Sequence, residues 1–249
     1  MKVYFLPQKK IYFGGAALLI LGVFLASSLF YFRSEPAALK VGAPVYQGNS
    51  GQKAVALTVN VDWGEEFIPG MLKLFKENDA QVTFFVTGKW AEKNSEMLKK
   101  MKEAGHSIQN HGYKHLHFNS LSSEQASEQI KKAEDVIYKS VGEKSRFFAP
   151  PYGEQNQQLS NITAAMDYEL ILWSIDTVDW KRPAPATIVN RVISKVHNDA
   201  IILMHPTEPT VKALPDMLKN LKEQGYKMQS IDKIVINKSK DLVTNEKSH

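Results

Sequence analysis

The sequence predicts an α/β fold and, within that class, an imperfect (β/α)7-8 barrel. From residue 54 onward, short apolar segments alternate with longer amphipathic segments, which gives roughly seven strands separated by helices. This alternation is typical of a parallel sheet covered by helices. Polar and titratable residues also recur where the predicted strands end. Barrels of this class collect their chemistry at the carboxyl ends of strands, so the second observation supports the first.

The first predicted strand is "AVALTVNVD", residues 54–62. Side chains alternate across a strand, so the even-numbered residues, among them Asn60 and Asp62, share one face. The odd-numbered aliphatic residues share the other face. An amide and a carboxylate at one strand end indicate the edge of a site. The amide is unexpected because it cannot hold or release a proton near neutral pH.

The remaining elements follow in chain order. Helical spacing of apolar residues predicts helices at 67–80, 90–105, 122–142, 156–167, 185–199 and 209–225. Short apolar segments predict strands at 81–88, 106–112, 145–153, 168–176, 200–205 and 226–231. Gly105 and Gly142 end two of the helices, in the position where glycine caps a helix C-terminus.

The N-terminal part predicts a membrane anchor. Residues 11–32 carry no charge, and a helix of 22 residues spans roughly 33 Å, enough for a bilayer core. Lysines precede this run, so the positive-inside rule places the N-terminus in the cytoplasm and the rest outside the cell membrane, as a single-pass protein. A cleaved signal peptide is the alternative, although its apolar core is usually shorter, roughly 7–15 residues. The expected boundaries are a cytoplasmic N-terminus at 1–10, the anchor at 11–32, a linker at 33–53, a folded domain at 54–237 and a polar tail at 238–249.

Composition limits the chemistry and the partners. The chain has no cysteine, so a metal would be held by histidine and carboxylate rather than by thiolate. The net charge of +5 suits attraction to anionic wall polymers or lipid head groups, and it suits a generic soluble surface equally well. No basic run carries interleaved aromatic residues, so nucleic acid is not an expected partner.

The strongest local signal for a metal is the pair His111 and His115. Two imidazoles four residues apart can reach one cation, although such a pair alone is weak evidence. A carboxylate at a neighbouring strand end, Asp62, would complete a three-ligand site with room for water, as in hydrolytic metal centres. The nearby His106 and His117 are interpreted as bystanders.

Two further groups lie at predicted strand ends. His205 follows the apolar strand "AIILM" and is either a core histidine or a general acid that points into the barrel mouth. Trp180 and Tyr152 can form an aromatic wall for the face of a sugar. Trp173 belongs to the same group by sequence, but packing is the preferred interpretation for it.

The order of these motifs resembles the polysaccharide deacetylase family, the NodB-like carbohydrate esterase family 4. Family members carry "TFDDG", "H-[ST]-x-x-H", "RPPYG", "DxxDW" and "LxH" in this order, and the chain has "TVNVDWG", "HGYKH", "FAPPYG", "DTVDW" and "LMH". The resemblance covers about residues 52–236. The "DWGEE" turn also resembles a branch of the family found in spore-forming bacteria.

The resemblance implies removal of an N-acetyl group from a sugar in a glycan such as peptidoglycan or chitin. It implies a divalent metal, commonly zinc, that activates water. In the family's pattern an aspartate takes the proton from that water, and here Asn60 stands in its place. Matched by position, the implied roles are His205 as acid, Asp179 as a residue that positions the catalytic groups, and His111 and His115 at the metal, with Pro151, Tyr152 and Trp180 expected at the substrate. Val61 falls on the aspartate that would bind the metal, and Asp62, one residue later, is the expected third ligand if a bulge at the strand end brings it to the metal.

Two departures from the family pattern place turnover in question. Asn60 replaces the base, and Ala149 replaces the arginine that would orient that base. Arg146 lies three residues earlier and therefore points to the other face of an extended strand. Loss of a general base typically costs about 10²–10⁴ in rate. Two hypotheses follow: an anchored metal-dependent de-N-acetylase of cell-wall or spore glycan with an altered base, or a degenerate relative that binds glycan or a partner without turnover.

Overall fold

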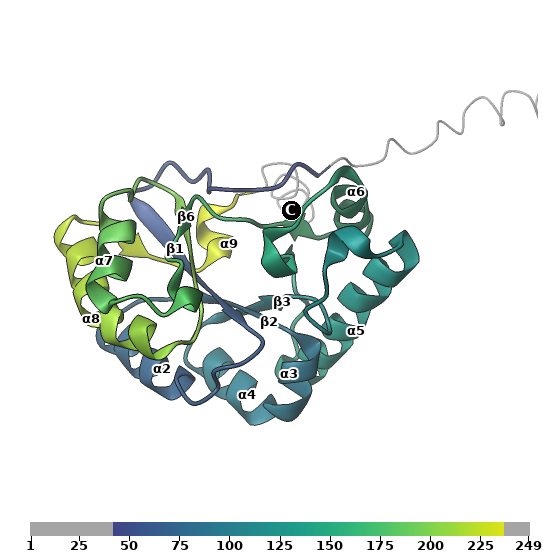
Figure 1. Cartoon of the computed structure of the whole chain (residues 1–249), viewed down its shortest axis with the longest axis horizontal. Coiled ribbons are helices and arrows are strands. Elements are labelled where there is room, and N and C mark those ends of the chain that lie inside the picture. The colour runs from purple at the N-terminus through teal and green to yellow at the C-terminus, as the bar shows by residue number, and fades with distance from the viewer. Residues whose placement is uncertain (1–41, 237–249) are drawn as a thin grey trace, which may run out of the picture. The chain divides into compact units, whose positions relative to one another are not determined.

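A single parallel sheet organises the protein in the computed structural model, which describes residues 42–236 (Figure 1). Within that range eight strands pair in the order β5-β4-β3-β2-β1-β7-β6, and β8 pairs with the start of β1. All the paired strands run parallel. This confirms the predicted α/β class and the imperfect barrel. The strands are β1 (Ala54–Val61), β2 (Thr83–Val86), β3 (Ser107–Asn110), β4 (Phe147–Phe148), β5 (Glu169–Leu170), β6 (Ile175–Asp176), β7 (Ala200–Met204) and β8 (Lys227–Met228).

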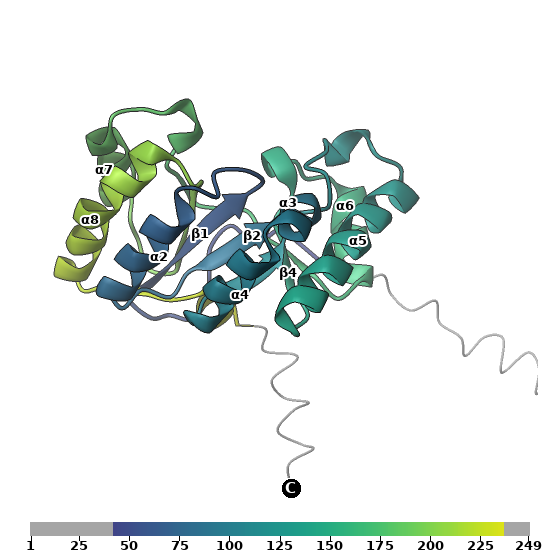
Figure 2. The ribbon, with the colours of Figure 1, turned by 90° about the horizontal axis from the view of Figure 1, so that it is seen from below.

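Helices surround the curled sheet. Figure 1 shows α7, α8, α2, α4, α3 and α5 in an arc around the strands, and Figure 2 shows α2 and α4 alongside β1 and β2. A parallel sheet needs such crossovers because consecutive strands must restart from the same end. The helices are α2 (Ile68–Glu77), α3 (Gly88–Lys93), α4 (Ser95–Glu103), α5 (Ser123–Val141), α6 (Gln157–Ala165), α7 (Pro185–Ile193), α8 (Glu208–Glu223) and α9 (Ile231–Ile234).

The alternation predicted for β1 is present. The odd-numbered residues from Val55 to Val61 belong to the larger apolar core, together with residues of α2 and α8 such as Phe75 and Leu214. Ala54 and Ala56 belong to a second apolar cluster inside the curl of the sheet. Because side chains alternate, Asn60 shares this inner face, where the strand ends meet.

The helix predicted at 90–105 is divided into α3 and α4. Asn94 lies between them with φ −124° and ψ 34°, outside helical geometry. Its side-chain Nδ2 donates to the Trp90 carbonyl at 2.9 Å, and its backbone N–H donates to the same oxygen at 3.1 Å. Asparagine competes in this way with helical hydrogen bonds, so it ends the first helix and starts the second.

The strand predicted at 168–176 is two strands on opposite edges of the sheet. β5 pairs with β4, whereas β6 pairs with β7. The chain between them crosses the gap between the two edges, where Val45 forms a parallel bridge with Ile171. The expectation of one continuous strand was therefore wrong, because apolar pattern alone does not reveal which neighbour each half pairs with.

Residues 42–51, which the sequence assigns to a linker, contact the domain. The N–H of Gly48 donates to the Asp199 carbonyl at 2.8 Å, and the Asp199 carboxylate accepts from Ser50 and Gly51. No helix within residues 42–236 is long and apolar enough to cross a membrane. The anchor predicted at 11–32 and the tail predicted at 238–249 lie outside the described residues.

Candidate functional site

A cavity of about 380 Å³ opens at the carboxyl ends of β1, β3, β6 and β7. This is the end of the sheet where parallel α/β folds place their sites, because the connecting loops gather there. The lining residues are Asn60, Trp63, His111, His115, Tyr152, Gly153, Trp173, Asp176, Trp180, Leu203 and His205. Six of the predicted site residues are therefore in one cavity, namely Asn60, His111, His115, Tyr152, Trp180 and His205.

Asn60 reaches this cavity from the inner face of β1. Its side chain is buried, with the residue only 7% exposed, and its Oδ1 has no hydrogen-bond partner among the described residues. An amide carries no titratable proton, so this group can accept or donate hydrogen bonds but cannot act as a general base.

His111 and His115 lie next to each other, with ring centroids 5.1 Å apart. His111 is buried, and its Nδ1 lies 2.6 Å from the Ala149 carbonyl oxygen. A carbonyl can only accept, so Nδ1 carries the proton and Nε2 keeps a free lone pair. Burial lowers the pKa of His111 to about 3, and burial also lowers the pKa of His115. His111 is therefore a neutral imidazole near pH 7, the form that binds a metal.

Asp62 lies close to His115 but does not form a three-ligand metal site with the two histidines. Its negative charge acts to raise the pKa of His115, so the two groups are close. However, its Oδ1 accepts a hydrogen bond from the Thr87 hydroxyl at 2.6 Å. Within residues 42–236 no three histidine or carboxylate side chains converge closely enough to hold one metal ion. The residues present therefore do not fit the three-ligand metal centre in this arrangement, and the assignment of Asp62, His111 and His115 to a metal stays a prediction.

His205 is fixed by Asp179, which is fully buried. The Asp179 carboxylate accepts from the His205 backbone N–H at 2.6 Å, from His205 Nδ1 at 2.8 Å and from the Thr210 hydroxyl at 2.6 Å. Because Nδ1 faces the carboxylate, Nε2 is the nitrogen that remains available to the cavity. This pairing has the geometry of an oriented acid–base group rather than of a core histidine without a partner.

Aromatic side chains form the rim of the cavity. Tyr152, Trp180 and Trp63 are 58%, 53% and 40% exposed, which is unusual for such large rings. His117, interpreted from sequence as a bystander, stacks on Tyr152 at a centroid distance of 3.9 Å and thereby supports the rim. Pro151, which precedes Tyr152 in the chain, is buried and is not among the lining residues.

Several lining residues were not expected from sequence. Trp63 lies parallel to His205, with ring centroids 6.2 Å apart and an interplanar angle of 6°. Trp173 packs against the inner apolar cluster, as preferred from sequence, and also lines the cavity. Gly153 leaves room for it, since a Cβ there would lie 2.5 Å from the Trp173 ring. The signal that could have found Trp63 and Gly153 is their position within motifs at strand ends, "TVNVDWG" and "FAPPYG".

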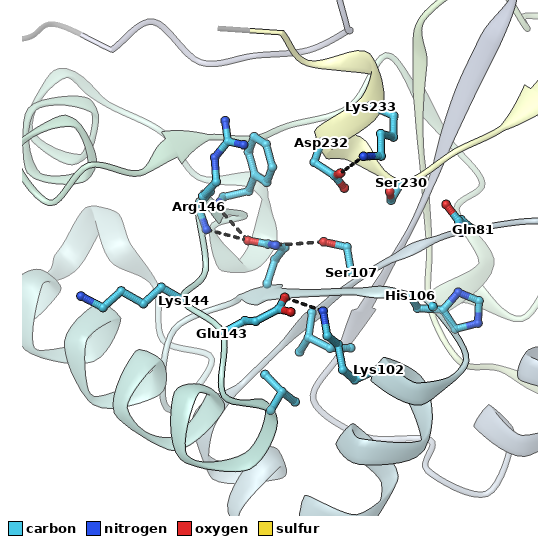
Figure 3. A pocket seen from close by; sticks show the side chains of 15 residues that line it. Gln81, Lys102, His106, Ser107, Glu143, Lys144, Arg146, Ser230, Asp232 and Lys233 are labelled. Atoms are coloured by element: carbon cyan, nitrogen blue, oxygen red, sulfur yellow. Dashed lines mark hydrogen bonds and ion pairs between the residues drawn. The ribbon is translucent and has the colours of Figure 1, made fainter. Parts of the chain in front are cut away.

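The opposite end of the sheet has a second cavity, of about 300 Å³ (Figure 3). Its lining includes Lys102, Glu143, Lys144, Arg146, Asp232 and Lys233. Arg146, the arginine nearest to Ala149 in the chain, is therefore at the wrong end of the sheet to orient a group near Asn60. Its guanidinium lies 3.8 Å from the Glu169 carboxylate.

Comparisons with known proteins identify the family of this chain. Residues 47–171 match the family described as polysaccharide deacetylase. The uncharacterized protein YlxY of Bacillus subtilis (strain 168) is 36% identical over 192 residues, which are 77% of this chain and 60% of that protein. Bc1960, a peptidoglycan N-acetylglucosamine deacetylase of known structure, is 30% identical with a TM-score of 0.75, over 78% of this chain and 93% of that one.

A further similar structure is BA3943, described as a CE4 family pseudoenzyme from Bacillus anthracis. It is 39% identical with a TM-score of 0.75, over 78% of this chain and 69% of that one. A BA3943 mutant described as having restored enzymatic activity matches equally well, with a TM-score of 0.75. The match to the family over half of the chain, together with these relatives, shows that the chain belongs to the polysaccharide deacetylase family, carbohydrate esterase family 4.

Proposed function

We propose that this chain is a membrane-anchored, extracytoplasmic protein that binds N-acetylated wall glycan through a deacetylase-type cavity without efficient turnover. The observation that carries the proposal is Asn60, a buried amide in the position of the base, whose Oδ1 has no partner within residues 42–236. Ala149 supports it, because alanine replaces the arginine that the family pattern places there, and Arg146 lies 3.8 Å from the Glu169 carboxylate instead. The likeness to a family pseudoenzyme supports it independently.

The retained features favour a glycan as the ligand. Exposed aromatic rings at a concave site stack well on the apolar faces of sugars, and Trp63, Tyr152 and Trp180 offer three such rings. Relatives described as peptidoglycan deacetylases act on peptidoglycan. A peptidoglycan-like or chitin-like glycan is therefore the proposed ligand class.

Slow de-N-acetylation is the second candidate function. The His205–Asp179 pair favours it, because a positioned imidazole with a free Nε2 is the group needed to protonate a leaving amine. The proposal of a divalent metal such as zinc belongs with this candidate. It requires a third ligand beside His111 and His115, and Asp62 is engaged by Thr87 in the arrangement described.

Activity assays on variants of the full chain in detergent test the proposal. We expect the parent to release no measurable acetate from N-acetylglucosamine oligomers, with or without added zinc. The double change Asn60→Asp with Ala149→Arg restores a base and its partner, and we expect it to raise the rate by about 10²–10⁴. Ala149→Arg alone is the matched control and stays inactive. Robust activity in the parent that Asp62→Ala abolishes would overturn the proposal in favour of the second candidate.

The location can be tested separately, because the chain contains no cysteine. A cysteine introduced at the exposed Tyr138 of α5 reacts with a membrane-impermeant maleimide in intact cells if the domain is extracytoplasmic. A cysteine at Gln8 reacts only after lysis if the N-terminus is cytoplasmic. Labelling of both positions in intact cells, or of neither, contradicts the proposed topology.

A further inference from the structure

The curled sheet is open between its two edge strands, and the bridging segment, residues 45–49, crosses this opening (Figure 1). On one side the N–H of Val45 donates to the Leu170 carbonyl, and the Val45 carbonyl accepts from the Leu172 N–H, both at 2.8 Å. On the other side Gln47 forms an antiparallel bridge with the first residue of β7. No strand pairing closes the opening in the part of the chain that the structure describes, so the bridging segment joins its two sides.

The chain that crosses from β5 to β6 carries one side chain of the cavity at the carboxyl ends of the strands, Trp173. At one end of this crossing the Ile171 N–H donates to a carbonyl of β4 at 2.8 Å, and at the other the Ser174 N–H donates to a carbonyl of β7 at 3.1 Å. Between these ends the Leu172 N–H donates to Val45. The residue that precedes Trp173 is therefore held by the bridging segment and not by a strand of the sheet.

Side-chain packing continues this connection into the cavity. Val45 and Trp173 both pack against the inner apolar cluster. A Cβ at Gly153 would lie 2.5 Å from the Trp173 ring, so the ring fits closely against the chain that carries Tyr152 at the rim. Close-packed interiors have little free volume and therefore transmit displacements. A shift of the bridging segment would thus reach Trp173 and the rim of the cavity.

We infer that the bridging segment is a positioning element of this cavity, so that docking of the segment in the opening and ligand binding in the cavity stabilise each other. The inference rests on the proposed function for the class of ligand, a wall glycan. The coupling is reciprocal, because a ligand that binds the docked arrangement better also raises the population of that arrangement. The stretch that leads into the domain from the predicted anchor would thereby take part in glycan binding.

Matched truncations within the inner apolar cluster separate this coupling from general stability. Val45→Ala and Val235→Ala remove the same atoms from the same cluster, but Val45 holds the crossing that carries Trp173, whereas Val235 follows α9. In the full chain in detergent, we expect Val45→Ala to weaken binding of an N-acetylglucosamine tetramer about five- to tenfold and to change the tryptophan emission of the free protein. Val235→Ala should keep the affinity and emission of the parent. Val45→Ile retains the apolar contact and should bind as the parent does.

Hydrogen exchange of individual amides tests the reciprocal direction without a substitution. The Val45 and Leu172 amides exchange when the bridging segment opens locally, because each donates across the contact between them. A saturating concentration of the tetramer should slow the exchange of both amides about five- to tenfold. The control is the Gln81 amide, which donates to the Met228 carbonyl at the amino ends of the strands and should keep its rate.

The outcomes distinguish this inference from the proposed function. If the tetramer binds the parent but the two alanine variants lose affinity equally, or if exchange at Val45 and Leu172 stays unchanged, the coupling is refuted while glycan binding stands. If the tetramer does not bind the parent, the proposed ligand fails, and the emission of the free variants decides the coupling alone. Emission of Val45→Ala equal to that of the parent then refutes it. If Val45→Ala does not fold, the exchange measurement on the unmodified chain decides.

Discussion

The two cavities at opposite ends of the sheet are of similar size but differ in how their polar groups are used. At the amino ends of the strands, the charged groups pair with one another: Lys102 with Glu143, and Lys233 with Asp232. Figure 3 shows Lys144 extending away from the other labelled side chains. At the carboxyl ends, supporting contacts orient His111 and His205 but leave their Nε2 atoms available. The two cavities are therefore alike in volume and differ in the hydrogen-bonding capacity that their side chains leave unused.

Two buried amides make the same contrast. Gln109, in the cavity at the amino ends, accepts from the backbone N–H groups of Arg146 and Phe147 at 2.9 Å each and donates to the Ser107 hydroxyl. Its amide joins the starts of β3 and β4. Asn60 has the same chemistry, yet its oxygen has no hydrogen-bond partner in the part of the chain that the structure describes. The Gln109 amide is therefore part of the scaffold, whereas the buried Asn60 Oδ1 joins no other element among the described residues.

The largest expected effect is on stability and comes from removing the Asp179 carboxylate, which orients His205 in the cavity at the carboxyl ends of the strands. Asp179→Ala leaves three donors unpaired in a buried place, so we expect the free energy of unfolding to fall by about 3–5 kcal/mol. Urea unfolding measures it. Asp176→Ala is the control, since its carboxylate is half-buried and its one hydrogen bond is to Val178, and it should cost only about 1 kcal/mol. Equal losses for the two variants would contradict the special role of Asp179.

The second effect concerns pH and the cavity at the amino ends. Burial lowers the pKa of His106 from 6.5 to about 4. The unfolded chain then binds the proton first, so this histidine destabilises the fold as pH falls from 6.5 to 4, by up to about 3 kcal/mol. Above pH 6.5 the contribution is absent. His106→Gln should reduce the loss of stability over this window, whereas the exposed His117→Gln should not, as thermal unfolding at several pH values would show.

A third substitution, at Gly64, tests how Trp63 is held at the aromatic rim of the cavity. Gly64 has φ +84°, and a Cβ there would lie 2.3 Å from the Pro206 carbonyl oxygen. This close approach holds the turn that carries Trp63 against the segment that carries His205. Gly64→Ala should therefore cost about 2–3 kcal/mol and displace Trp63, with a changed tryptophan emission. Gly51→Ala, at φ +71° with open space around it, should cost only about 1 kcal/mol and leave the emission unchanged.

The smallest expected effect is at the paired charges. Lys102→Ala removes one exposed ion pair, which is worth about 0–1 kcal/mol. Glycan affinity should not change, because the proposed glycan site is the cavity at the carboxyl ends of the strands. A loss of glycan affinity in Lys102→Ala or in Lys144→Ala would show that the two cavities have been assigned the wrong way round.

The sequence predicted the parts of the fold that depend on local pattern. Alternation placed Asn60 on the inner face of β1, and apolar spacing followed by Gly142 predicted the helix that is α5, whose capping box and left-handed end are present. The division of 168–176 could not be predicted, since each half is defined by a strand far away in the chain. The Asp62–Thr87 hydrogen bond and the Trp63–His205 stack could not be predicted either. Both depend on side-chain positions that a periodic sequence pattern does not determine.

The segment that bridges the two edges of the sheet has a consequence for the order of events during synthesis. Val45 bonds to residues 170 and 172, Gly48 to Asp199, and Asn49 to Ile234 and, across a separation of 187 residues, to Ile236. Contacts of such high sequence separation form slowly, since the intervening chain must first be ordered. The segment around residues 45–49 leaves the ribosome before the rest of the domain, but it is among the last parts to form its native contacts. Until then the two sheet edges that it joins stay open to other strands.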